Sequence, residues 1–275
     1  MNSTRRGWAL LPEAVKTFVR KRILHEAAGR DLTVKEDDTF VVSYPKSGNT
    51  WIRFLIGNIY HRSETITFSN IEEKVPDIYH HSDRSLLKLP RPRILKSHES
   101  YDARYPRVIY VVRDPRDVVV SYYHYLIKMR AIDESYPMGR FVEQFIAGEW
   151  DWCGSWRGNV ESWLQGSSAN DDFLLLRYED MLSSTFEAVE RIALFLGKEL
   201  SEQDIQLAID ASSFDRMRSL EQEDAGEWKA IRSGRRDKPF MRSGKAEGWR
   251  STLAPEHADR IRTEWGDLMQ RLKYD

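Results

Sequence analysis

Residues 40–60 read FVVSYPKSGNTWIRFLIGNIY, and this stretch decides how the rest of the chain is interpreted. It opens with three apolar residues, typical of a strand that is buried on both faces of a parallel sheet. Pro45 ends the strand, and from Thr50 onward apolar residues recur at helical spacing over most of the surface. We therefore predict a strand, a loop and a buried helix.

The loop between this strand and helix has the composition of an anion site. A helix start leaves backbone N–H groups unpaired, Gly48 lets the backbone curl round an anion, and Lys46 adds a positive charge. The NTPase pattern Gly-x-x-x-x-Gly-Lys-Ser/Thr is absent, because no glycine precedes Lys46 at the required place and the lysine comes before Ser47-Gly48. The sequence predicts a phosphate loop that differs from that of an ATPase.

Length and composition limit the classes of protein that fit. At 275 residues with 41% hydrophobic content, the chain suits one α/β domain spanning residues 1–275. The 42 Lys and Arg residues balance 43 Asp and Glu, so we expect no nucleic acid partner. Cys153 is the single cysteine, which excludes an intrachain disulfide framework and any Cys-rich metal site, and we expect no metal. Without an 18-residue apolar run or a secretory signal, a cytoplasmic protein is expected.

Residues 5 to 28 pair basic with apolar side chains and predict an amphipathic helix within residues 1–30. Such a helix can make a weak contact with a membrane surface, or it can pack on its own domain. No lipidation motif supplies a second membrane signal. Both alternatives stay open at this point, and so does the oligomeric state.

Three further apolar runs, at residues 93–98, 108–112 and 173–178, predict strands that alternate with helices. This alternation favours a parallel sheet flanked by helices on both faces. Lys96 and His98 share one side of the second strand, at the carboxyl end where open α/β sheets bind ligands. His98 is a candidate base because imidazole has a pKa near neutrality. After the third strand, Asp114 predicts a helix cap next to Arg113.

Several segments remain less regular. Arg113 could bind an anion or simply pair with Asp114 or Asp117. Residues 61–92 are polar and rich in proline, and residues 215–247 predict a long mobile loop that orders with a ligand. The glycine and basic residues of 242–245 suit a second anion.

The order of these features resembles the sulfotransferases that use 3′-phosphoadenosine 5′-phosphosulfate (PAPS), and the resemblance covers most of the chain. Residues 44–51 look like the family's 5′-phosphosulfate loop, and residues 107–124 look like its 3′-phosphate segment. Further similar segments are Leu95-Lys96-Ser97-His98, Gly154-Ser155-Trp156, Arg177-Tyr178-Glu179-Asp180-Met181, Ser212-Ser213-Phe214 and Pro239-Phe240-Met241-Arg242-Ser243-Gly244.

The resemblance implies a P-loop-like sulfotransferase fold and a nucleotide site for PAPS or its product, adenosine 3′,5′-bisphosphate (PAP). That site would consist of Lys46, Ser47, Gly48, Asn49, Thr50, Trp51, Arg113, Ser121, Tyr178, Phe214, Arg242, Ser243 and Gly244. Within it, Arg113, Ser121 and Arg242 would bind the 3′-phosphate, and the loop around Thr50 would bind the 5′-phosphate.

The resemblance also implies transfer of a sulfuryl group to a hydroxyl or amine of a small-molecule acceptor. His98 would take the acceptor's proton, Lys96 would stabilise the sulfuryl group, and Lys46, with a reference pKa of about 10.4, would stay a cation at the leaving phosphate. The acceptor pocket would include Pro45, Lys96, His98, Tyr125 and Trp156. No metal is implied.

Some residues depart from the family's pattern. Ser243 stands where the family commonly has Lys, so one positive charge is missing unless Lys245 replaces it. Glu99-Ser100 replaces Leu-Pro, which predicts a more polar acceptor mouth. Two rival functions stay open: a nucleotide-dependent kinase on a similar fold, and a non-catalytic nucleotide-binding module at a membrane surface.

Overall fold

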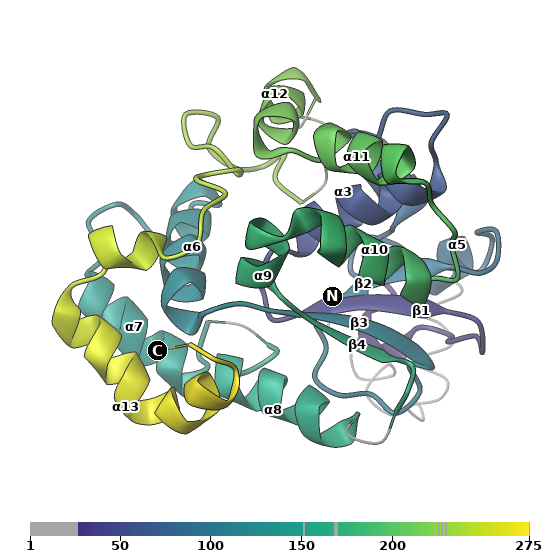
Figure 1. The fold of residues 1–275 in the computed structure, drawn as a ribbon. Coiled ribbons are helices and arrows are strands. Elements are labelled where there is room, and N and C mark those ends of the chain that lie inside the picture. Colours follow the sequence, from purple (N-terminus) through teal and green to yellow (C-terminus); the bar gives the residue numbers. More distant parts are fainter. Residues whose placement is uncertain are drawn as a thin grey trace, which may run out of the picture.

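The chain is described here from a computed structural model, which places residues 27–150, 152–167, 170–224, 226, 228 and 230–274. The described residues form a four-stranded parallel sheet with helices on both faces (Figure 1), as predicted. Its strands, in the spatial order β2-β1-β3-β4, are β1 (Thr39–Ser43), β2 (Ile94–Ser97), β3 (Arg107–Val112) and β4 (Phe173–Arg177). Most of the predicted N-terminal helix lies outside the described residues, so it stays a prediction.

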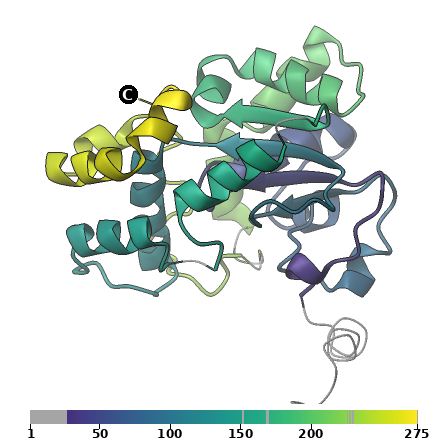
Figure 2. The same cartoon turned by 90° about the horizontal axis from the view of Figure 1, so that it is seen from below.

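Side chains that alternate along the strands face two separate cores. Phe40 and Val42 of β1 belong to one core, which also includes residues of α6 (Pro115–Lys128), α7 (Met138–Ala147), α8 (Trp156–Gly166) and α13 (Pro255–Arg271). Val41 belongs to the other, with residues of α3 (Asn49–Tyr60), α10 (Thr185–Phe195), α11 (Glu202–Ala211) and α12 (Phe214–Asp224). Figure 2 shows the sheet between its two helical layers. All residues of β1 are buried, which explains its apolar centre, Phe40 to Val42.

The helices that follow β1 and β3 begin as the sequence predicts. Gly48 precedes α3 with a φ of 100°, in the left-handed region that favours glycine. Asp114 caps α6 by accepting a hydrogen bond from the Arg116 N–H, and Pro115 is its first residue. Because both helices start directly after parallel strands, their N-termini lie at the carboxyl edge of the sheet.

The remaining elements are short or peripheral. Between α3 and β2 only two four-residue helices form, α4 (Ile71–Lys74) and α5 (Asp83–Leu86), as the prolines of that segment suggest. The other elements are η1 (Gly29–Asp31), α9 (Tyr178–Ser183) and η2 (Gly248–Ser251). Within the described part of the chain, no helix has both the length and the hydropathy needed to cross a bilayer.

The prediction of a continuous loop over residues 215–247 is wrong for its first third, which belongs to α12. The helix is amphipathic but has few apolar residues: Met217 and Leu220 are buried among otherwise mostly charged or polar side chains. So few apolar positions give a weak periodic signal, and packing on the core supplies the stability that the sequence pattern does not show.

Candidate active site

A cavity of about 320 Å³ lies at the carboxyl ends of β1, β2 and β3. The segments that follow these strands contribute Lys46, His98 and Arg113, and α12 with the segment after it forms the opposite wall. Of the residues predicted for the site, the cavity is lined by Pro45, Lys46, Gly48, Asn49, Thr50, Trp51, Lys96, His98, Arg113, Ser121, Tyr125, Tyr178, Phe214, Arg242, Ser243 and Gly244.

The phosphate loop curves tightly, as its glycine suggests. A Cβ atom at Gly48 would lie only 2.5 Å from Cδ2 of Tyr178, so no larger residue fits there. The Asn49 amide is turned toward the sheet, where Nδ2 donates to the Val41 carbonyl at 3.3 Å. Ser47 is fully buried and does not line the cavity, and its hydroxyl has no hydrogen-bond partner among the described residues. The loop thus faces the cavity with Gly48, Asn49 and Thr50, while the unsatisfied Ser47 hydroxyl lies behind it.

Lys46 projects into the cavity between two aromatic rings. Its Nζ lies 4.3 Å from the ring centre of Tyr125 and 4.1 Å from that of Phe240. Among the described residues it makes no ion pair with a carboxylate. Burial, together with the nearby charges of Arg113 and Lys96, lowers the pKa of Lys46 to about 7. The sequence predicted that Lys46 stays a cation. With the lowered pKa, this holds at neutral pH only if a bound anion restores the ordinary pKa of Lys46.

His98 is held in one tautomer. Its Nδ1 lies 2.7 Å from the carbonyl oxygen of Ser43, which can only accept a hydrogen bond, so the proton sits on Nδ1 and Nε2 keeps its lone pair. Burial, and then the charge of Lys96, lower the pKa of His98 to about 3. The ring is therefore neutral near pH 7.

Lys96 lies in the same cavity but has a carboxylate partner. Its Nζ is 2.8 Å from Oδ2 of Asp77, and both side chains are almost completely buried. Burial lowers the pKa of Lys96, and the ion pair with Asp77 opposes that shift. The carboxylate of Asp77 fixes the position of the Lys96 ammonium group. Lys46 has no such carboxylate partner among the described residues.

Arg113 connects the two walls of the cavity. Its guanidinium donates to the carbonyl oxygens of Lys46 at 3.4 Å and Lys245 at 3.0 Å, and its Cζ lies 4.2 Å from the ring centre of Tyr178. The carboxylate of Asp117 is 3.7 Å away, so the expected pairing with Asp117 forms, and anion binding by this arginine stays a prediction. Its buried Nε has no partner in the described part of the chain.

The residues that we predicted to bind a second anion lie close to one another, beside Arg113. Ser121, Arg242 and Ser243 all line this part of the cavity. Gly244 has a φ of 60° and packs so closely on Phe214 that an added Cβ would clash with its ring. Partial burial, and then the charge of Arg113, lower the pKa of Arg242, whereas the carboxylate of Asp117 opposes this shift.

Comparison with known proteins agrees with this arrangement. The sulfotransferase domain family matches residues 36–273. The chain belongs to this family. Sulfotransferase 2A2 of Rattus norvegicus is 31% identical over 251 residues, which cover 87% of this chain and 86% of that protein. Amine sulfotransferase of Oryctolagus cuniculus is 28% identical over 261 residues, covering 90% and 84% of the two chains.

A solved structure has the same fold. Retinol dehydratase in complex with androsterone and inactive cofactor PAP superposes with a TM-score of 0.75 at 22% identity, covering 94% of each chain. Together with the sequence relatives, this makes the protein an enzyme of the sulfotransferase class, as the sequence predicted. Within the described ranges, no group of three or more His, Cys, Asp or Glu side chains is placed to hold a metal ion.

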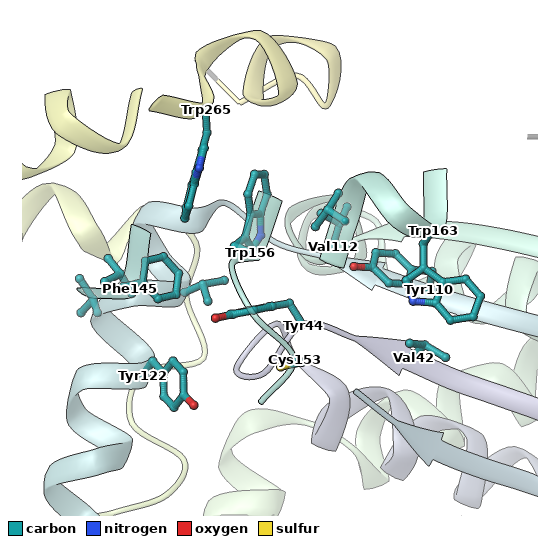
Figure 3. Packing of buried hydrophobic residues seen from close by; sticks show 14 of the residues in the cluster. Val42, Tyr44, Tyr110, Val112, Tyr122, Phe145, Cys153, Trp156, Trp163 and Trp265 are labelled. Atoms are coloured by element: carbon teal, nitrogen blue, oxygen red, sulfur yellow. The ribbon is translucent and has the colours of Figure 1, made fainter. Parts of the chain in front are cut away.

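Two expectations about the sulfotransferase pocket are wrong. Trp156 does not line the cavity: it is fully buried, its ring centre is 5.4 Å from that of Trp265, and its indole N–H donates to the Arg113 carbonyl (Figure 3). It therefore supports Arg113 from the core. Glu99 does not make the acceptor mouth more polar, because it is buried and accepts a hydrogen bond from the Tyr79 hydroxyl. Tyr79, by contrast, lines the cavity.

The sequence did not single out several residues that line the cavity of this sulfotransferase. They include Arg53, Asp77, Tyr79, His80, Tyr122, Trp152, Trp228, Phe240 and Met241. Tyr122, Phe240 and Met241 lie in segments that resemble the sulfotransferase family, but no role was predicted for them. Asp77 could have been found only from its pairing with Lys96, a contact between residues 19 positions apart.

Proposed function

We propose that this sulfotransferase transfers a sulfuryl group from PAPS to the hydroxyl or amine of a small-molecule acceptor, in line, with His98 as general base. The observation that carries the proposal is the neutral His98 ring, whose Nε2 lone pair is kept free by the Ser43 carbonyl in a cavity that also holds Lys46 and Arg113. A free base beside Lys46, which has no carboxylate partner among the described residues, suits a reaction that moves an anionic group onto a neutral nucleophile.

The residues of the cavity fit the nucleotide. The Nε of Arg113, a residue that lines the cavity, is a buried polar atom without a partner among the described residues, and such a group is costly unless a ligand satisfies it. The loop at Gly48 and the start of α3 would hold the 5′-phosphate, and Arg113, Ser121 and Arg242 would hold the 3′-phosphate. The nucleotide supplies the sulfuryl group and the phosphate from which it departs.

His98 accepts the acceptor's proton at Nε2. A base with a low pKa is a weak one, so it takes the proton late, when the acceptor oxygen is already bonding to sulfur and has become acidic. Negative charge bound beside the ring favours the imidazolium, which helps this transfer. The hydrogen bond from Nδ1 to the Ser43 carbonyl keeps the ring oriented throughout.

The two lysines have different tasks in this proposal. Lys46 neutralises the charge that develops on the departing phosphate, and it is drawn to its charged form by that same anion. Lys96, fixed by Asp77, stabilises the sulfuryl group during transfer. Androsterone in the structural neighbour supports an acceptor that is a small molecule.

The test uses purified protein, sulfur-labelled PAPS and a panel of phenols, aliphatic alcohols, sterols and amines. We expect labelled product with at least one hydroxyl acceptor, and unchanged rates after chelation of divalent metal. Phosphate transfer from ATP that requires Mg²⁺ would favour the kinase alternative. PAP binding without turnover of any acceptor would favour the non-catalytic module.

A further inference from the structure

The backbone of His98 is held on both sides by side chains that the mechanism above does not use. Its N–H donates to the hydroxyl of Tyr79 at 3.0 Å, and its carbonyl oxygen accepts from Nδ2 of Asn159 at 3.1 Å. Tyr79 comes from the segment before β2, and Asn159 comes from α8. With the Ser43 carbonyl on the ring, three hydrogen bonds from separate parts of the chain fix this one residue.

Tyr79 is itself oriented by an acidic partner. Its hydroxyl oxygen accepts from the His98 N–H, and its hydrogen can bond to Oε1 of Glu99, 3.3 Å away, or to the more distant Oγ of Ser97, 3.5 Å away. Glu99 is 4% exposed, and Tyr79 stays protonated because burial raises its pKa. The ring of Tyr79 lies nearly parallel to that of His98, with 12° between the planes and 6.3 Å between the centres. A shift of Tyr79 would therefore move the backbone of His98.

Asn159 is oriented in the same way from the opposite side. It is fully buried, and its Oδ1 accepts a hydrogen bond from the Tyr110 hydroxyl at 2.8 Å. This bond decides which end of the amide faces His98, so Nδ2 is left to donate to the carbonyl. Both supports of His98 are thus fixed by a further hydrogen bond.

We propose that Tyr79 and Asn159 are positioning residues that keep Nε2 of His98 aimed at the acceptor, with Glu99 holding Tyr79. The inference rests on the proposed role of His98. A general base acts within hydrogen-bond reach of the proton that it takes, and a misplacement of about 1 Å can cost a factor of about 100 in rate. Hydrogen bonds at the backbone of the base control that placement directly.

The first experiment removes one hydroxyl. Tyr79→Phe keeps the ring and loses the hydroxyl with its contacts to the His98 N–H, Glu99 and Ser97, and we expect kcat to fall by roughly tenfold to a hundredfold. The affinity for PAP should not change, because no predicted nucleotide contact is touched. The matched control is Tyr136→Phe, which removes a tyrosine hydroxyl bonded to Gln144 away from the cavity and should leave kcat unchanged.

Conservative and disruptive changes at Glu99 provide a second measurement. Glu99→Gln keeps a side-chain oxygen that can accept from Tyr79, so it should retain most of the wild-type kcat. Glu99→Leu removes the nearer of the two acceptors and should lower kcat toward that of Tyr79→Phe. Equal losses in the two variants would contradict the role of Glu99.

A double-mutant cycle separates positioning from general structural support. If Tyr79 acts through His98, Tyr79→Phe should have no further effect on kcat once His98 is replaced by Ala. Asn159→Ala should behave in the same way. Additive losses in the His98→Ala background would overturn the inference while leaving the proposed function intact. A wild-type protein that transfers no sulfuryl group to any acceptor would instead overturn the proposed function, and the inference with it.

Discussion

The two walls of the cavity are built differently. The sheet-edge wall, which we define as Lys46, Lys96, His98 and Arg113, follows directly from three parallel strands. Three of these side chains are bonded to nearby carbonyls or a carboxylate, at Ser43, Asp77 and Lys46. The covering segment, residues 214–247, contributes Phe214, Phe240 and residues 242–244, and Arg242 is exposed.

This difference suggests that the two walls of the cavity have different functions. Groups that stabilise a transition state must be fixed before the reaction, because reorganising them would consume the interaction energy they provide. Groups that bind a nucleotide can be ordered by the ligand itself. We therefore expect changes in the sheet-edge wall to lower kcat and changes in the covering segment to lower nucleotide affinity. Arg113 bonds to both walls and should affect both quantities, and so should Lys46, whose charge depends on the bound anion.

The largest effect is expected at His98. His98→Ala should lower kcat by a factor of about 10² to 10⁴, the usual contribution of a general base. PAP affinity measured by calorimetry should stay at the wild-type value, because the ring is bonded to Ser43 and lies outside the predicted phosphate contacts. A variant with near wild-type turnover would remove His98 from the mechanism and contradict the different functions proposed for the two walls.

The second effect concerns the 3′-phosphate. PAP should bind more tightly than 5′-AMP, which lacks that group. The ratio of the two dissociation constants should be tenfold for each loss of about 1.4 kcal/mol in interaction free energy. Bidentate arginine contacts to phosphate are among the strongest available, so we expect at least about a hundredfold. Arg242→Ala should reduce the difference without lowering kcat at saturation. If it weakens PAP and 5′-AMP equally, the 3′-phosphate assignment is wrong.

The third prediction uses the pKa of Lys46, which burial, Arg113 and Lys96 lower to about 7 in the ligand-free protein. Glu221 opposes this shift, and Lys128 adds to it. Above pH 7 the Lys46 amine is mostly neutral. When an anionic ligand binds and restores the ordinary pKa, the amine must take up a proton from solution. PAP affinity should then fall by up to about tenfold for each pH unit above 7.

Calorimetry at pH 8 in buffers of different ionisation enthalpy measures this proton directly. We expect uptake of about one proton for each PAP bound by the wild type. The side chain at position 46 of Lys46→Met cannot titrate, so proton uptake on PAP binding should be close to zero in this variant. Any uptake that remains in the variant comes from the nucleotide itself. The same uptake in both proteins would mean that Lys46 is already charged without a ligand.

The sequence predicted the sheet-edge wall well because its signals are local. The strand, the loop and the helix around Gly48 are contiguous, and Asp114 caps α6 within two residues of the group it bonds. The apolar centre of β1 also predicted the parallel sheet, since the strand is buried on both faces. Local chemistry was sufficient in each of these cases.

Long-range packing could not be predicted in the same way. Nothing near Trp156 in the sequence indicates whether its ring faces the cavity or Trp265, which is more than a hundred residues away. The contact of Asn159 with His98 spans 61 residues, and that of Tyr79 with the same residue spans 19. The positions of these side chains depend on how α8 and the segment before β2 pack in the folded chain.

The smallest effect is expected at Ser243, in the covering segment. Ser243 lines the cavity near the predicted 3′-phosphate site, whereas Lys245 is exposed and its carbonyl accepts from Arg113. Ser243→Lys adds a charge there, and a hydrogen bond to a charged group contributes about 1.5–3 kcal/mol. Ordering a lysine side chain costs about 1.5–2 kcal/mol, so the net gain should be about 1 kcal/mol or less. PAP should therefore bind up to about fivefold more tightly, with kcat unchanged. Ser243→Met is the matched control for chain length without charge, and an equal gain in both variants would mean that packing, and not the charge, improves binding. Unchanged affinity in Ser243→Lys but weaker binding in Lys245→Met would show that Lys245 moves in to contact the phosphate when the nucleotide is bound.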